Sequence, residues 1–474
     1  MLVKSLSLLP EILLLLTAIF IQIIHWVRKE QTPKTFASIS KIGIILALGA
    51  CVIFYNLSLN PHWILNSPYT TFFKVLILFI TLISNFLGCK WFLSQNYSSH
   101  RYYQLICFIV LGLCIAISAQ NLALLMLALF FDIGLVYFLV IMCQDVADTQ
   151  KIRLTYWINL ILFSLFFGSA CIFLYTQTGT LFLDEISEYY KSTVPTPFDS
   201  LAVCLLFAAL IFLIGAAPFH FSLLQMIKNN ILPAAAFIAL IFPIGGLAVL
   251  ISLFHHSMTA FNEPLSYLLL CCGIISILFG AIGTGCFTNL RQLFFCVGVF
   301  NLGIIFVLFS FSRISELQAG IVYFLIYQIS MLGIYTCFYG MRYHGEYLND
   351  VDNLSGMSAT KPYISAAMLI FIFSLLGFPP LLGLLGNLTL INSLLAENAF
   401  YLIGFIFFML IILAHGLLKV IKSIYFNPRH NHFDRADIGV YCCLLLNILI
   451  ILISVIHPNY WMYDIEEVIR IFLS

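Results

Sequence analysis

The sequence predicts an all-α polytopic membrane protein, because of its composition and its long apolar runs. Of its 474 residues, 62% are apolar and only 9% are charged, whereas about 25% of the residues of a typical soluble domain carry a charge. Apolar runs of about 20 residues, long enough to cross a bilayer as a helix, follow one another along the chain. We therefore expect a single membrane domain over residues 1–474.

About fourteen such runs can be counted between the polar breaks, which makes fourteen expected spans. The longest polar connection, at 178–199, is too short for a soluble domain. The expected spans lie near residues 7–27, 40–60, 71–93, 102–120, 121–143, 154–177, 200–224, 231–254, 264–286, 292–312, 318–340, 362–386, 399–421 and 439–457.

The loop charges predict the orientation of these spans. Sixteen Lys and Arg residues lie in loops after odd-numbered spans, and four lie in the other loops and the tails. Positively charged loops stay on the cytoplasmic side of a membrane. Because the number of spans is even, both termini are expected on the non-cytoplasmic side.

Two of the expected spans contain a helix break. Pro218 interrupts span 7, and Pro379 and Pro380 interrupt span 12, because proline lacks a backbone donor and crowds the preceding turn. Backbone groups freed at mid-membrane are tolerated only where protein or a water-filled cavity satisfies them. The breaks therefore point to an ion path rather than to a simple anchor.

The spacing of the two breaks predicts an internal repeat. They are five spans apart, so a five-helix unit repeated in tandem would enter the membrane from opposite sides. We expect two inverted five-helix repeats, at residues 102–254 and 264–421. Interrupted helices at matching positions of inverted repeats are typical of transporters.

Cofactor and metal motifs are not found in the sequence. The 14 cysteines lie singly in apolar runs or as direct neighbours, and no Cys-x-x-Cys occurs, so we interpret them as small apolar core residues. No flavin, iron–sulfur or quinone motif is present either. We expect this chain to hold no cofactor and no metal, and to bind no nucleic acid.

Six short motifs, each found once, are spread along nearly the whole chain. They are LLPEILLL at 8–15, PFH at 218–220, TNLRQLFF at 288–295, DVDNLSGM at 350–357, FSLLGFPP at 373–380 and GLLGN at 383–387. In this order and spacing they resemble the antiporter-like subunits of respiratory complex I, within them the subunit N family of NADH-quinone oxidoreductase. The resemblance implies a proton-channel module of fourteen helices in a bacterial inner membrane.

The same resemblance implies partners and cofactors in other chains. The module would dock on the other membrane and peripheral subunits of the complex. Electron transfer from NADH to quinone, with FMN and iron–sulfur clusters in partner subunits and quinone as the substrate of the complex, would drive proton translocation through such modules.

The resemblance further implies a row of Glu and Lys side chains at mid-membrane, since ionisable groups can pass protons along a wetted path. At the corresponding positions this sequence has other residues. The position of the span 5 glutamate and those of the lysines in spans 6, 7, 8 and 12 hold, in that order, Phe130, Thr155, Leu213, Pro243 and Asn387.

Four other ionisable residues lie in or beside the expected spans. Asp132, at the centre of span 5, is either a relocated proton site or a structural acid. His220, after the span 7 break, is either a proton relay or a cap for carbonyls of the broken helix. Lys74 is expected to snorkel toward the outer surface, and Glu11 to have a structural role there.

Three functional interpretations are therefore open. The chain could conduct protons by a changed route through water, His220 and Asp132, or it could be a non-conducting scaffold of the same complex. The third is a subunit of a multisubunit sodium/proton antiporter, against which the LLPEILLL and DVDNLSGM motifs argue.

Overall fold

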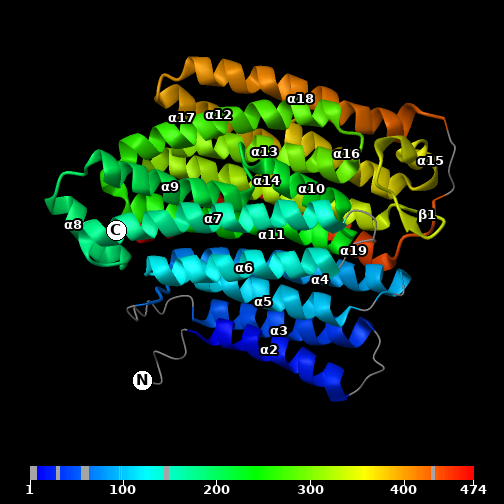
Figure 1. Ribbon diagram of the computed structural model, residues 1–474. Coiled ribbons are helices and arrows are strands. Elements are labelled where there is room, and N and C mark those ends of the chain that lie inside the picture. Colours follow the sequence, from blue (N-terminus) through cyan, green and yellow to red (C-terminus); the bar gives the residue numbers. More distant parts are fainter. Residues whose placement is uncertain are drawn as a thin grey trace. The chain divides into compact units, whose positions relative to one another are not determined.

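The structure is a computed structural model that describes residues 8–27, 33–54, 63–95, 97, 99–142, 149–428 and 433–473 (Figure 1). Within helices, the side chains of a few residues, Thr155 among them, lie outside this description. The described residues are almost entirely helical. Their one named sheet is a short antiparallel hairpin of β1 (Arg342–Tyr343) and β2 (Glu346–Tyr347).

The predicted fold class is confirmed in the described part of the chain. It contains 13 helices that are long and apolar enough to cross a membrane, and two shorter apolar helices, α16 (Pro362–Leu376) and α17 (Leu382–Ala396), on either side of the second predicted break. These two together take the place of span 12, which ends ten residues later than predicted.

The chain forms two compact units, of which the first comprises residues 1–215, 229–265 and 468–474. Its elements are α2 (Leu9–Val27), α3 (Pro33–Ile53), α4 (Pro68–Ser94), α5 (His100–Ser118), α6 (Leu122–Met142), α7 (Thr149–Thr178), α8 (Leu183–Ser192), α9 (Pro197–Ile214), α11 (Leu232–Ser252), η2 (Leu253–Ser257) and η3 (Thr259–Phe261).

Helix α11 is a central helix of unit 1. It is apolar on every side and buried from Leu232 to Ile251, as expected for a helix without a polar face. It packs on α4, α5 and α9, while α2 to α6 lie alongside one another (Figure 1). Pro243 lies inside α11 and is also buried.

The second unit comprises residues 216–228 and 266–467. Helix α14 packs on α13, α16, α17 and α19, and so lies at its centre. Its elements are α13 (Leu290–Phe309), α14 (Ile314–Gly340), η4 (Val351–Leu354), α15 (Met357–Thr360), α16, α17, α18 (Phe400–Phe426), α19 (Ile438–Ile456) and most of α10 (His220–Asn229), α12 (Asn262–Cys286) and α20 (Pro458–Leu473).

Two helices of ten residues or more were not predicted as elements. α8 lies in the polar connection 178–199, and α20 follows the last expected span. In α20 the buried residues Ile465, Val468 and Ile469 recur at helical spacing, but Glu466 and Glu467 lie among them. An apolar stripe of this kind gives an amphipathic helix without giving an apolar run, so a search for runs misses it. The boundaries of the two predicted repeats stay a prediction.

Candidate functional site

The two helix breaks have the same local plan. Helix α9 ends one residue before Gly215, and α10 begins five residues after it; α16 and α17 have the same spacing around Gly377. Both glycines adopt the left-handed backbone conformation, with φ of 80° and 78°, which glycine does without steric cost. A proline follows three residues later in each case, at Pro218 and at Pro380, and the peptide bond before each is cis.

The freed backbone groups of the first break find partners. The N–H of Gly215 donates to the carbonyls of Ile211 and Phe212. The N–H of Ala217 donates to Oγ of Ser276 on α12, at 3.0 Å, and both residues belong to unit 2. A side chain far along the sequence therefore satisfies a backbone donor that the broken helix can no longer use.

At the second break, α16 ends in a Schellman turn. The N–H of Gly377 donates to the carbonyl of Ser374 at 3.1 Å, and that of Phe378 donates to Phe373 at 3.0 Å. The amide of Asn387, on α17, donates to the carbonyl of Leu376 at 3.4 Å. Asn387, at the position of the implied lysine, thus contributes to the cap of the broken helix.

A small polar cavity of about 10 Å³ lies beside this break, with room for about one water molecule. Two hydrogen bonds shape its wall. The hydroxyl of Tyr323 donates to Oδ1 of Asn301 at 2.9 Å, and the hydroxyls of Ser330 and Ser374 share a hydrogen bond of 2.9 Å. The polar residues that line it are Asn301, Tyr323, Tyr327, Ser330, Ser374 and Asn387.

Asp132 lies at the centre of α6 and is fully buried, with a relative exposure of 0%. Neither of its carboxyl oxygens has a hydrogen-bond partner among the described residues. The carboxyl group packs against Gly112 of α5, where a Cβ would collide with it. The structure thus makes room for an acid but gives it no hydrogen-bond donor there.

His220 is the first residue of α10 and is buried. Its ring lies 4.0 Å from that of Phe221 and 5.0 Å from that of Phe279 on α12, measured between centroids. Its Nδ1 has no hydrogen-bond partner among the described residues. Asp132 belongs to unit 1 and His220 to unit 2, so each is a separate candidate.

The other positions of the implied path hold no ionisable group. Phe130 on α6 is 39% exposed, whereas Leu213 and Pro243 are buried. The side chain of Thr155, on α7, lies outside the described part of the chain.

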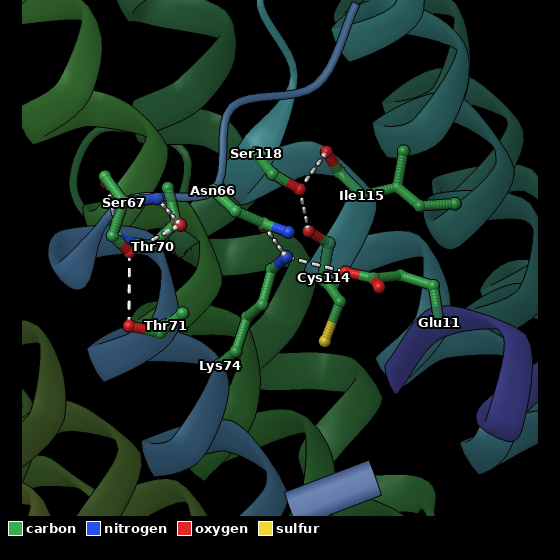
Figure 2. Close-up of polar contacts among 9 residues, drawn as sticks. All are labelled: Glu11, Asn66, Ser67, Thr70, Thr71, Lys74, Cys114, Ile115 and Ser118. Carbon is green, nitrogen blue, oxygen red and sulfur yellow. Dashed lines mark hydrogen bonds and ion pairs between the residues drawn. The ribbon is translucent and has the colours of Figure 1, made fainter. Parts of the chain in front are cut away.

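The prediction that Lys74 snorkels is wrong. Its side chain is only 1% exposed, and its Nζ lies 2.6 Å from Oε1 of Glu11 on α2 and 2.9 Å from Oδ1 of Asn66 (Figure 2). Glu11 is buried as well, and its Oε2 has no partner among the described residues. Sequence reasoning therefore missed a buried ion pair between α2 and α4.

Local contacts hold this pair in place. Asn66 precedes Ser67, which caps α4 through a reciprocal pair of hydrogen bonds with Thr70 (Figure 2). The N–H of Leu65 donates to the carbonyl of Ser118, the last residue of α5, at 2.7 Å. The sequence did hold a signal for this pair. Glu11 and Lys74 carry opposite charges, and each lies about one helical turn after the start of a span that begins on the same side of the membrane.

Comparisons with known proteins identify relatives of the whole chain. A family model described as "NADH:quinone oxidoreductase/Mrp antiporter, TM" matches residues 119–413. NADH-quinone oxidoreductase subunit N of Azorhizobium caulinodans is 24% identical over 435 residues, and the match covers 90% of each chain.

Two solved structures have the same fold. A chain of respiratory complex I from Thermus thermophilus matches with a TM-score of 0.79 and 18% identity, over 96% of this chain and 98% of that one. A chain of the Mrp complex from Dietzia sp. DQ12-45-1b matches with a TM-score of 0.82 and 14% identity, over 100% of both.

Proposed function

Since this chain belongs to the NADH:quinone oxidoreductase/Mrp antiporter transmembrane family, we propose that it is a membrane subunit, of the subunit N type, of a proton-translocating NADH:quinone oxidoreductase. The resemblance that the motifs predicted is confirmed by the family match and by curated relatives of that name. In the proposed complex, electron transfer from NADH to quinone is coupled to the movement of protons across the membrane.

The observation that carries this proposal is the pair of matching helix breaks. Each has a left-handed glycine, a proline three residues on and backbone groups satisfied by distant or local partners. A helix that only anchors a protein gains nothing from such a break. A small cavity beside the second break, lined in part by hydroxyl and amide side chains, supports the proposal.

The redox chemistry of the proposed complex belongs to other chains. FMN and iron–sulfur clusters would be held by partner subunits, and the quinone would be reduced there. The role proposed for this chain is therefore proton movement and docking on its partners.

The proposed location is a bacterial inner membrane, with multiple passes. The chain's apolar helices and its family support a multi-pass membrane protein. The excess of Lys and Arg in loops after odd-numbered spans supports the proposal that both termini face away from the cytoplasm.

A scaffold role in the same complex is the second candidate. It is favoured by Leu213, Pro243 and Asn387, which cannot exchange a proton at the positions where the family resemblance implies lysines. A sodium/proton antiporter is the third, since the fold is shared with a chain of an Mrp complex.

Purification of the complex through a tag on this chain separates the candidates. The expected result is co-purification of a complex that oxidises NADH with quinone and acidifies or alkalinises sealed vesicles without a need for sodium. Normal NADH oxidation with a proton-to-electron ratio below that of relatives having all their lysines would favour the scaffold. Sodium-dependent proton exchange without NADH oxidation would contradict the proposal.

A further inference from the structure

We propose that Glu11, Lys74 and Asp132 form a proton-binding cluster in unit 1. The inference rests on the proposed function, because a proton site has a use only if protons cross this chain. In this proposal the proton-binding groups lie on α2, α4 and α6. The positions where the family resemblance implies Glu or Lys are instead occupied by Phe130, Leu213 and Pro243.

The first part of the cluster is the buried pair itself. Removing two charges from water costs more than a single contact returns, unless further hydrogen bonds satisfy the remaining atoms. Lys74 has two acceptors, Glu11 at 2.6 Å and Asn66 at 2.9 Å. Glu11 uses Oε1 for this contact, while Oε2 is buried and has no partner among the described residues. Oε2 of Glu11 can therefore accept a proton.

The second part is Asp132. It is 0% exposed, and both of its oxygens lack a partner among the described residues. A structural acid is expected to accept hydrogen bonds from nearby donors, which is not found here. The space beside Gly112 accommodates the carboxyl group without tying it down. Asp132 is therefore suited to gain and lose a proton.

Helix α5 joins the two parts. Gly112 contacts Asp132, and Ser118, six residues further along α5, accepts a hydrogen bond from the N–H of Leu65, next to the Asn66 that binds Lys74. The titratable groups that face the cluster among the described residues are two thiols, those of Cys114 on α5 and Cys51 on α3. At a rise of 1.5 Å per residue, the Gly112 and Ser118 positions on α5 lie about 9 Å apart.

Buried polar groups continue beyond Asp132 within the same unit. The amide of Asn85 on α4 donates to Oγ of Ser40 on α3 at 2.9 Å, and Ser40 lies 3.4 Å from Sγ of Cys107 on α5. Cys107 is five residues from Gly112, on the side away from Ser118. Polar groups thus lie along α5 on both sides of Asp132.

The cluster exchanges one proton at a time. With Lys74 as an ammonium, Glu11 as a carboxylate and Asp132 as the neutral acid, its net charge is zero. Release of the Asp132 proton toward the Cys107 side leaves one negative charge, which favours uptake of a proton from the Asn66 side. Within the pair, transfer across the 2.6 Å contact converts ammonium and carboxylate into amine and carboxylic acid without a change of net charge.

Glu11→Gln and Asp132→Asn in the assembled complex test this cluster, with Glu188→Gln, an exposed acid on α8, as the matched control. Two quantities are measured in sealed vesicles: NADH oxidation and the number of protons moved per NADH. A redox-induced infrared difference spectrum adds a readout that a structural role would not move. We expect both cluster variants to move fewer protons per NADH than the native complex. Asp132→Asn should also lose an infrared band of a protonated carboxyl group, and Glu188→Gln should match the native complex.

An unchanged proton count and an unchanged carboxyl band in both variants would overturn the cluster. If a single substitution prevents assembly, the double variant Glu11→Met/Lys74→Met keeps the packing and removes both charges. A full proton count in that variant would equally overturn the inference. The proposed function itself fails in a different way, namely if the native complex oxidises NADH without moving protons or does not contain this chain.

Discussion

The Cα of Gly383, on α17, packs directly on the backbone carbonyl of Ser374, near the end of α16. This contact brings the two halves of the broken span together beside the polar cavity that both residues line. A Cβ at position 383 would overlap the Ser374 carbonyl, and backbone atoms cannot rotate away as a flexible side chain can. The geometry of the second break therefore requires glycine at 383.

Gly383→Ala is expected to separate α16 from α17 and to lower the stability of the folded chain by at least about 1–3 kcal/mol, the usual cost of overpacking. The measurement is the midpoint of thermal unfolding of the purified complex, together with its yield. Gly404→Ala, in the middle of α18, is the control, because a Cβ there meets nothing within 4 Å. Equal midpoints for the two variants would contradict the packing argument.

Gly112→Ala is expected to act through Asp132. The new methyl group would press on the carboxyl group, which is the far end of a side chain and can shift at some cost. We expect a loss of about 1–3 kcal/mol in the free energy of unfolding. Gly134→Ala on α6, where a Cβ meets nothing within 4 Å, is the matched control.

A double-mutant cycle makes the Gly112 prediction specific. Asp132→Ala removes the carboxyl group, so the added cost of Gly112→Ala should fall in that background. Residues in contact give interaction energies of about 0.5–3 kcal/mol in such cycles. Additive effects of the two substitutions, measured by denaturant unfolding in detergent, would show that the methyl group clashes elsewhere.

Lys74→Met is expected to destabilise the chain by about 3–5 kcal/mol, because it leaves the Glu11 carboxylate buried and without its cation. Glu11→Met/Lys74→Met should recover most of this loss, since replacing both charges by apolar groups of similar size is often neutral. Thermal unfolding and assembly of the complex provide the measurement. A Lys74→Met variant as stable as the native chain would show that Lys74 reaches solvent after all, as a snorkelling side chain would.

The sequence predicted the spans and both breaks because each rests on a local cause. Apolar runs reveal membrane helices, and Pro218 and Pro380 each lack the backbone N–H that a continuous helix would use at that position. The Glu11–Lys74 pair could not be predicted in this way. The two residues are 63 positions apart in the sequence and meet only because α2 and α4 both pack on α5. Asp132 was found by its charge alone, whereas its contact with Gly112 depends on how α5 and α6 face each other. The α20 helix was missed for the opposite reason, since its apolar stripe is periodic and not continuous.

The stability of the folded chain is expected to depend on pH through Lys361, which precedes α16 and lies outside the spans. It is buried, and its Nζ donates to the carbonyl of Gly340 at 3.0 Å. Burial lowers the pKa of Lys361 to about 8, against an opposing effect of Asp434 and a smaller lowering by Arg342. In the unfolded chain its pKa is the ordinary 10.5. Between these values the unfolded chain binds one more proton than the folded one, so stability rises as the pH rises from about 8 toward 10.5.

Comparison with Lys361→Met isolates this contribution. The difference in unfolding midpoint between the native complex and the variant should be constant below about pH 8 and shift in favour of the native chain above it. Lys228→Met, which removes an exposed lysine, serves as the control. A difference that stays constant up to pH 10.5 would mean that the Lys361 ammonium is as well solvated in the folded chain as in the unfolded one.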